Sequence, residues 1–478
     1  MYCKFNISKS IFAFAILMVA NVAGYAQKAW TLRECVDYAL ENNITVKQNE
    51  LSSELADLAV VQNRYALLPS LNASANRNWN FGRTIDPFTN LFTTQQVQSD
   101  NISLNTNVTL FSGFQLRNTL KQSQLDYMAG LSDLQKIRND ISLNVISAYL
   151  QVLFAKEQLK VAAARVTQST EQRDRIKRMV DAGTMVQGNL LDAESQLSNE
   201  ELSNITAENQ LANATLSLTQ LLQLQSPEGF DVQEPDVPLP DVSVAALTPS
   251  QIYDIALKTL PEVKAADTRI SSAEKGITIA KGGYYPRITA FGSVSSFYSS
   301  SSKKISGVDF NGYQPDGSIT AGGDTVLSPS FSSRLEDNPY SDQFDNNLNR
   351  AIGLSLNIPI FNGLTTRIGV KRAKLNYENA RYSAQQTRNQ VYQSIQQAHT
   401  DALAARKRFD ATERNLTAFQ EAYQYAEKRF NAGLLNSLEF LTATNNLTRT
   451  KIELLQAKYD FIFRVKVLDF YAGNPLTF

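Results

Sequence analysis

The side chains that usually carry enzyme chemistry are scarce in this sequence of 478 residues. It contains one histidine, His399, and two cysteines, Cys3 and Cys35. Metal centres and catalytic triads need several such residues close together, so neither a His/Cys metal cluster nor a His-based triad can be built. The sequence also has no P-loop and no dinucleotide glycine fingerprint. We therefore expect no catalysis, no cofactor and no bound metal.

Charge and the amino-terminal segment indicate where the chain works. Acidic and basic residues number 46 each, which argues against a nucleic-acid partner. Lys4 and Lys9 precede an apolar stretch, Ile11–Val22, and a small-x-small site ends at Ala26. The stretch is shorter than the roughly 20 apolar residues that span a bilayer. Residues 1–26 are therefore predicted to be a signal peptide, and the chain to be exported.

The sequence is duplicated. Thr31–Leu40 returns as Thr248–Leu257, an offset of 217 residues, and Leu110–Gly113 returns as Ile360–Gly363, an offset of 250 residues. The two halves therefore run in step apart from an insertion of 33 residues. Such a duplication predicts two copies of one structural unit, residues 27–225 and 250–478. A Pro-rich linker, residues 226–249, joins them and is expected at the equatorial region.

Each half contains a very long helical pattern. Residues 114–180 and 364–430 have no Pro and almost no Gly, which predicts helices over about 113–181 and 363–431. A helix of that length extends roughly 100 Å. Each pattern stops at a glycine, and a returning helix follows, over about 188–224 and 436–471. Apolar residues at seven-residue spacing in the returning helices favour left-handed coiled-coil packing.

Period-two patterns precede each long helix and predict β-hairpins, over about 70–111 and 286–360. Apolar residues alternate there with Asn, Ser and Thr, and Arg77 is the one exception in its strand. The segments have the roughly ten-residue length of transmembrane strands, and Trp79 and Phe81 stand near an end like an interfacial girdle. A half-buried sheet on a soluble core is the alternative. Four strands cannot close a barrel in lipid, so two, three or four chains must share one.

The loop between the strands of the second hairpin is long. It covers about 299–349, is rich in Ser, Gly, Asp and Asn, and holds most of the insertion. Long loops lie on the outside of transmembrane barrels, so a mobile external cover is expected, with carbohydrate binding as the alternative.

Motifs at matching places in the two halves resemble the TolC-like outer membrane efflux family. They are Leu110–Gly113, Ile358–Gly363 and the two Ala-Gly tips; the second tip, Arg429–Leu434 followed by Glu439, is the more typical. The resemblance implies an α+β membrane protein and a homotrimer. Its chains share a transmembrane β-barrel, four strands per chain, which a long periplasmic α-helical coiled-coil barrel continues. It implies a place in the outer membrane, with a large periplasmic portion.

The resemblance also implies partners and site residues. The tips dock a periplasmic adaptor (membrane fusion) protein and an inner-membrane pump of the RND or ABC type; they comprise Ala182, Gly183, Thr184, Ala432, Gly433 and Leu434. Charged residues near them are candidates for a periplasmic gate: Arg178, Asp181, Asp192, Arg429 and Glu439. An ordinary solvated helix face is the alternative for each charge. Asn189 stands where the second repeat has Glu439, so the tips are unequal, and which one docks is open.

The resulting functional hypothesis is a passive exit duct of a tripartite efflux or type I secretion system. A periplasmic coiled-coil scaffold without a pore is the alternative from another class, and a stand-alone porin is a third. The scaffold explains the helices but leaves the lipid-compatible strands without a role. Nothing in the sequence indicates the exported substrate.

Overall fold

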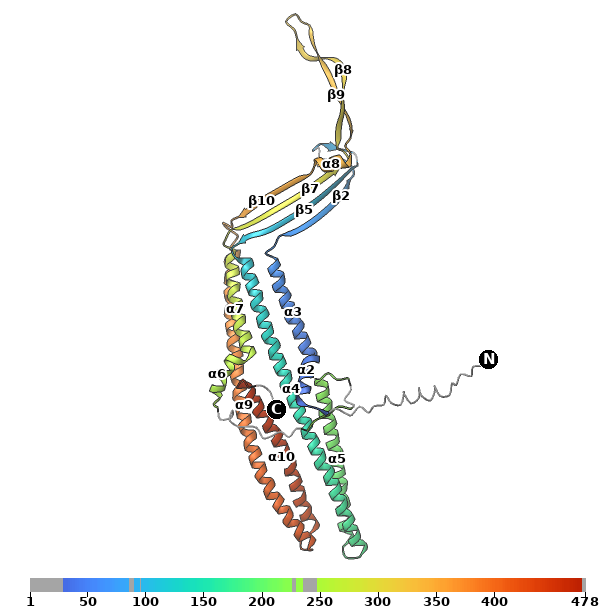
Figure 1. Ribbon diagram of the computed structural model, residues 1–478, viewed down its shortest axis with the longest axis vertical. Coiled ribbons are helices and arrows are strands. Elements are labelled where there is room, and N and C mark those ends of the chain that lie inside the picture. The colour runs from blue at the N-terminus through green and yellow to red at the C-terminus, as the bar shows by residue number, and fades with distance from the viewer. Residues whose placement is uncertain (1–28, 86–89, 95, 226–228, 235–246, 475–478) are drawn as a thin grey trace, which may run out of the picture. The chain divides into compact units, whose positions relative to one another are not determined.

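The computed structural model describes residues 29–85, 90–94, 96–225, 229–234 and 247–474 (Figure 1). The expected signal peptide and most of the expected linker lie outside the described residues. The chain divides into two compact units. The helical unit comprises Met1–Ala56, Asp126–Ile270 and Asn379–Phe478, and the strand unit comprises Asp57–Leu125 and Ser271–Glu378.

Helices dominate the helical unit, and four of them continue into the strand unit over residues 57–65, 115–125, 271–282 and 365–378. Two of them, α4 (Gln115–Asp181) and α9 (Thr365–Asn431), have 67 residues each, and α5 (Gln187–Leu221) and α10 (Ser437–Tyr471) follow them as the returning helices. The shorter helices are α2 (Leu32–Asn42), α3 (Ile44–Tyr65), α6 (Pro249–Thr259) and α7 (Pro261–Gly282). Of the helices described, none combines the length and apolarity needed to cross a bilayer.

Both long helices begin two residues after the expected starts at 113 and 363. Gly113 and Phe114 have φ of 60° and 62°, and Gly363 and Leu364 have φ of 59° and 63°. Two consecutive left-handed residues cannot belong to a right-handed helix, so each strand reaches its helix through a sharp turn. Gly113 also needs its lack of a side chain, because a Cβ there would lie 2.3 Å from the carbonyl oxygen of Gly282. The returning helix α5 ends at Leu221, three residues before the expected end, because Gln223 has φ of 60°.

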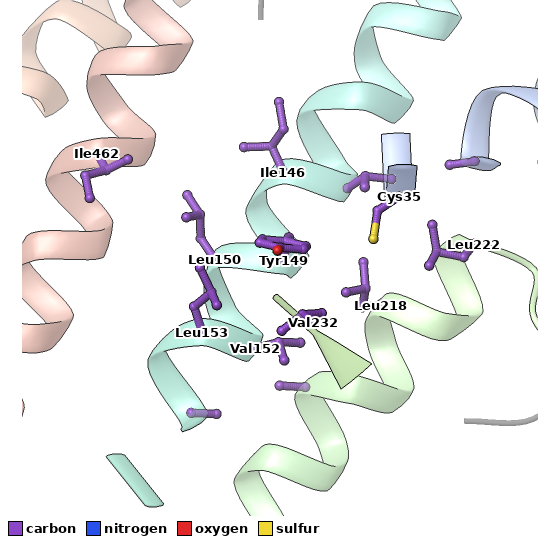
Figure 2. Close-up of a cluster of buried hydrophobic side chains, with 14 residues drawn as sticks. Cys35, Ile146, Tyr149, Leu150, Val152, Leu153, Leu218, Leu222, Val232 and Ile462 are labelled. Carbon is purple, nitrogen blue, oxygen red and sulfur yellow. The ribbon is translucent and has the colours of Figure 1, made fainter. Parts of the chain in front are cut away.

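The duplication reappears in the cores of the helical unit. Thr31 and Thr248 cap α2 and α6 through matching capping boxes, with Glu34 and Gln251 as the third residues. The first core packs Cys35 and Ala39 of α2 against α4 and α5 (Figure 2), and the second packs Ile252 and Ala256 of α6 against α9 and α10. Residues 217 apart therefore fill equivalent core positions.

A short pair of parallel strands packs beside the first core. Strand β1 (Ala29–Trp30) runs parallel to β6 (Asp231–Val232). The hydroxyl of Tyr149, at the centre of Figure 2, donates to the carbonyl oxygen of Gln233 at 2.6 Å. Burial raises the pKa of Tyr149 and raises that of the Cys35 thiol to about 12. Neither group ionises near neutral pH, so Cys35 behaves as a small apolar core residue.

The strand unit contains a four-stranded antiparallel sheet in the order β10-β7-β5-β2. Its strands are β2 (Ser70–Asn80), β5 (Val97–Ser112), β7 (Arg287–Ser299) and β10 (Asn349–Asn357). β10 ends at Asn357, three residues before the expected limit. The central pair, β5 and β7, joins the two sequence repeats. A second, short hairpin pairs β3 (Thr84–Ile85) with β4 (Phe92–Thr93).

The register places most apolar side chains on one face of the sheet and most polar ones on the other. Phe291 and Phe297 lie among the polar side chains, and Thr106, Ser296 and Arg350 lie among the apolar ones. Directly paired residues share a face, and Leu104 pairs with Val294 while Ala290 pairs with Leu354. The apolar face also contains Leu71, Ala73, Ile102, Ile288, Ile352 and Leu356. The opposite face contains Asn72, Ser74, Asn76, Asn101, Ser103, Asn105, Asn107, Thr289, Ser293, Ser295 and Ser355. Most of the apolar face is exposed in one chain, with Ile352 at 95 %.

Arg77, the exception in its strand, lies on the apolar face near one end of the sheet. Its guanidinium donates to both carboxylate oxygens of Asp100, the residue opposite on β5, at 2.7 and 2.6 Å. Asp100 is buried. The Asp100 carboxylate neutralises the guanidinium within the apolar face, so the cross-strand pair explains the exception.

Most of the segment expected to be a long loop, about 299–349, forms strands and a helix, and this corrects the loop assignment. It forms a long hairpin of β8 (Lys303–Ile319) and β9 (Thr325–Asp337), followed by α8 (Tyr340–Asn346) (Figure 1). Gln343 of α8 is buried and bonds to both the N–H and the carbonyl oxygen of Ser299, at 3.0 Å each. The periodicity of the β9 sequence favours a strand, and the many Ser and Gly residues of the segment obscure it.

Candidate functional site

The two helical hairpins end in tips of the same construction. At the first tip, the N–H of Thr184 donates to the carbonyl oxygen of Met179 at 2.9 Å, and that of Gly183 donates to Val180 at 2.9 Å. At the second, Leu434 and Gly433 make the equivalent bonds to Arg429 and Phe430. This pair of bonds is a Schellman motif, which requires a left-handed residue. Gly183 and Gly433 supply it, with φ of 70° and 71°.

All six tip residues are exposed, as a docking surface must be. An added Cβ at Gly183 or Gly433 would meet no atom of this chain within 4 Å. The glycines therefore serve the geometry of the turn, and they leave room for another molecule to approach the backbone closely.

The five charged gate candidates are exposed, and they fall into two groups. Arg429 is engaged at its own tip, where its guanidinium donates to the carbonyl oxygen of Leu434 at 3.3 Å and lies 5.8 Å from the ring of Tyr425. Arg178, Asp181, Asp192 and Glu439 form no ion pair within the part of the chain that the structure describes. The structure therefore does not bring the five side chains together within one chain.

The two tips differ in how the returning helix starts. Asn436 caps α10, and its side-chain oxygen accepts the N–H of Glu439 at 2.8 Å. Val186 stands at the equivalent place before α5 and makes no side-chain cap. Glu439 also lies in the first turn of α10, where the helix dipole favours a negative charge. The second tip is therefore the more firmly built of the two.

A buried ion pair on the first helical hairpin was missed by the sequence reasoning. The guanidinium of Arg165 on α4 donates to the carboxylate of Glu200 on α5 at 2.8 Å, and each side chain is only 10 % exposed. Gln196 also donates to Glu200, at 2.5 Å. Asn445 of α10 accepts longer contacts from Arg165 and Gln196, at 3.4 and 3.5 Å. The cluster therefore links the first helical hairpin to the second.

A second group of contacts links the hairpins closer to the tips. Gln168 of α4 donates to the hydroxyl of Tyr423 on α9 at 2.8 Å. Burial, followed by the nearby carboxylate of Glu427, raises the pKa of Tyr423, so its hydroxyl remains protonated. Phe440 stacks on Phe430 with the ring centroids 4.7 Å apart, which ties α9 to α10. Together with the Arg165 cluster, these contacts fix how the hairpins lie within the helical unit.

One signal could have revealed Glu200. Buried alanines recur every seven residues along α5, at Ala193, Ala207 and Ala214, and Glu200 occupies the place of the missing member. An acid at a coiled-coil core position requires a buried partner. A polar groove of about 420 Å³ lies beside it, and its lining includes Asn199, Glu200, Asn445 and Arg449.

Comparisons with known proteins agree with this architecture. A model of the family described as "Outer membrane efflux protein" matches residues 35–223 and 252–474. The toxin and drug export protein A of Aggregatibacter actinomycetemcomitans is 24 % identical, over 75 % of this chain and 69 % of its own length. The outer membrane efflux protein BepC of Brucella suis is 23 % identical, over 96 % of this chain and 89 % of its own length. The crystal structure of the outer membrane protein VceC of Vibrio cholerae has a TM-score of 0.72 and 16 % identity, over 93 % of this chain and 97 % of that one.

Proposed function

This chain belongs to the outer membrane efflux protein family, and from that premise we propose how its two units form a duct. It is an outer membrane channel with a large periplasmic portion, and it serves as the passive exit duct of a tripartite efflux or type I secretion system. The family consists of transport proteins, and we assign no catalysis to the chain. Energy for export comes from a partner in the inner membrane.

The observation that carries the proposal is the two-faced sheet of the strand unit. One face is mainly apolar and largely exposed, which suits contact with lipid, and the other is lined mainly with Asn, Ser and Thr, which suits a water-filled lumen. β2 and β10 are the edge strands, and their outer backbone groups would be unsatisfied in a bilayer. Further copies of the chain must complete the barrel, and we propose a homotrimer.

The helical unit is proposed to form the periplasmic part of the duct. The tips, with Gly183 and Gly433 at their centres, dock a periplasmic adaptor and an inner-membrane pump of the RND or ABC type. The polar groove beside Glu200 and Asn445 offers the adaptor side chains a second place to bind. Arg178, Asp181, Asp192 and Glu439 are exposed and available for pairing between chains, which supports a gate of charges around the pore axis.

Opening is proposed as a two-state movement of the tips. The helical hairpins are held together within one chain by the Arg165–Asn445 and Gln168–Tyr423 contacts. Adaptor contacts that favour an arrangement with the hairpins apart would shift the equilibrium toward an open duct.

The test is to extract the protein from outer membranes with detergent and record its conductance in planar bilayers. A duct gives discrete channels, and its purified form has the mass of several copies. Substituting Ile352 on the apolar face with Asp should reduce insertion into the membrane, whereas Ser355→Asp on the polar face should leave insertion intact. A protein that fractionates with the periplasm and forms no channels would favour the scaffold alternative.

A further inference from the structure

The β8–β9 hairpin is an amphipathic ribbon, defined here as Lys303–Asp337. Most side chains of β9 alternate: Leu327, Pro329, Phe331 and Leu335 lie on one face, which also includes Ser333, while Ser328, Ser330, Ser332 and Arg334 lie on the other with Val326. The paired residues of β8 continue the first face with Ile305, Val308, Phe310, Tyr313 and Pro315. We call this first set, from both strands, the apolar ribbon face.

Two irregularities in β8 keep this face continuous. The register shifts between Ile305 and Gly307 and again between Phe310 and Tyr313. Each shift inserts one extra residue into β8, and without it every later side chain would point to the opposite face. The insertions therefore return Val308 and Tyr313 to the side occupied by Phe331. The two bulges thus keep the apolar side chains of both strands on one continuous face, which indicates that this face has a role.

The apolar ribbon face is uncovered in one chain. Its seven large side chains are 55 to 67 % exposed: Ile305, Val308, Phe310, Tyr313, Leu327, Phe331 and Leu335. A two-stranded hairpin alone is marginally stable in water, and a contiguous exposed apolar patch usually marks a binding surface. The ring of Phe310 contacts those of Tyr313 and Phe331, with centroids 5.6 and 5.5 Å away. The surface is therefore ordered and ready to receive a second apolar surface.

The three basic side chains of the ribbon are paired, and the carboxylates without an ion pair in the described residues, Asp316, Asp324 and Glu336, lie on the polar face or in the turn. Arg334 pairs with Asp309 at 2.5 Å across the polar face. At the base, Lys303 pairs with Asp337, and Lys304 pairs with Asp342 of α8 at 3.2 Å. Gln343 fastens the base to β7 through Ser299. The ribbon is thus anchored to the sheet and presents apolar groups.

We propose that the apolar ribbon face packs against the same face of the other copies of this chain in the assembly. This inference rests on the oligomer of the proposed function. Every copy carries the ribbon at the end of β7, in a sheet that further copies must complete, so the ribbons are held at high effective concentration. Stable interfaces use about 20–30 residues a side, so a patch with seven large side chains is too small to hold a separate protein by itself. Copies of the chain do not depend on this patch alone, because the shared sheet already holds them together. The apolar ribbon face therefore fits a second copy best.

The test is chemical cross-linking of Phe331→Cys, with Ser332→Cys as the matched control. Both residues are exposed neighbours on β9, and they lie on opposite faces. Equivalent residues facing a common rotation axis meet at it, so a short bis-maleimide should link Phe331→Cys copies at least about tenfold faster than Ser332→Cys copies. The protein is purified in detergent, without other proteins, and cross-linked products are read on denaturing gels. The parent protein gives the background, because its Cys35 is buried.

Each outcome decides the matter. Equal cross-linking of the two variants in a purified assembly of several copies would overturn the proposal. So would an experiment in cells in which Phe331→Cys is cross-linked to another protein or to lipid, but not to other copies of the chain. A purified protein with the mass of a single chain would overturn both this inference and the proposed oligomer. To separate the two, residues 303–337 are replaced by a short turn. That deletion should leave mass and bilayer conductance unchanged, because the four-stranded sheet remains.

Discussion

The Arg165–Glu200 pair is the contact whose loss the structure predicts most sharply. Substituting Glu200 with Ala leaves the Arg165 guanidinium 10 % exposed with only the longer contacts to Gln168 and Asn445, both at 3.4 Å. Removing one partner of a buried pair costs about 3–5 kcal/mol, and we expect the lower end because these amides remain. The loss should appear as easier unfolding of the helical unit.

The double variant Arg165→Leu/Glu200→Leu separates the pair from its surroundings. Replacing both charges by apolar groups removes the desolvation cost together with the attraction, so its stability should fall within about 1 kcal/mol of the parent. The sum of the stability losses of the two single variants should therefore exceed the stability loss of the double variant by about 2 kcal/mol or more. Arg406→Ala, which breaks an exposed pair with Asp410 on α9, is the control and should cost less than about 1 kcal/mol.

The assay follows the helical circular dichroism of the purified assembly in rising denaturant, with the same detergent throughout. Four proteins form the cycle: the parent, Arg165→Leu, Glu200→Leu and the double leucine variant. Glu200→Ala and the control Arg406→Ala are measured beside them. Additive losses, or a Glu200→Ala loss as small as that of Arg406→Ala, would refute the claim that this pair is buried and coupled. Export measured in parallel shows whether the link between hairpins also matters for opening.

Three further predictions concern the tips, the strand-to-helix turns and pH. Gly433→Val should impair export, because a left-handed conformation costs an L-residue roughly 1–2 kcal/mol. Gly433→Asn should be tolerated, and both variants should assemble normally. Normal export by the Val variant would contradict the proposed docking role. Gly113→Ala should lower the amount of assembled protein more than Gly363→Ala, because only the former would overlap another backbone; equal yields would count against this. Burial raises the pKa of Glu262 above 4.5, so ionisation destabilises the fold as pH rises through that pKa, and Glu262→Gln should raise the thermal midpoint at pH 7 but not at pH 4. A gain that persists at pH 4 would mean that packing, not charge, is responsible.

Much of the architecture follows from periodicity alone. The helical and strand periods depend on backbone geometry, so the runs around Gln115–Asp181 and the alternation in Ser70–Asn80 predict their own type and which residues share a face. Gly183 and Gly433 mark the tips because a Schellman turn requires a left-handed residue. The seven-residue spacing of the returning helices likewise indicates their coiled-coil packing. These features are local, and each half of the chain repeats them.

Tertiary structure decided which elements meet. Arg165 and Asn445 are 280 residues apart, and nothing local to either indicates that both lie near Glu200. The pairing of β5 with β7 across the repeats depends on the whole chain in the same way. The bulges that align the apolar ribbon face appear only once β8 and β9 are in register, because an inserted residue breaks the period that sequence reasoning relies on. Sequence thus determined the kinds of element and their faces, while contacts between distant elements, which have no period, emerged only from the folded chain.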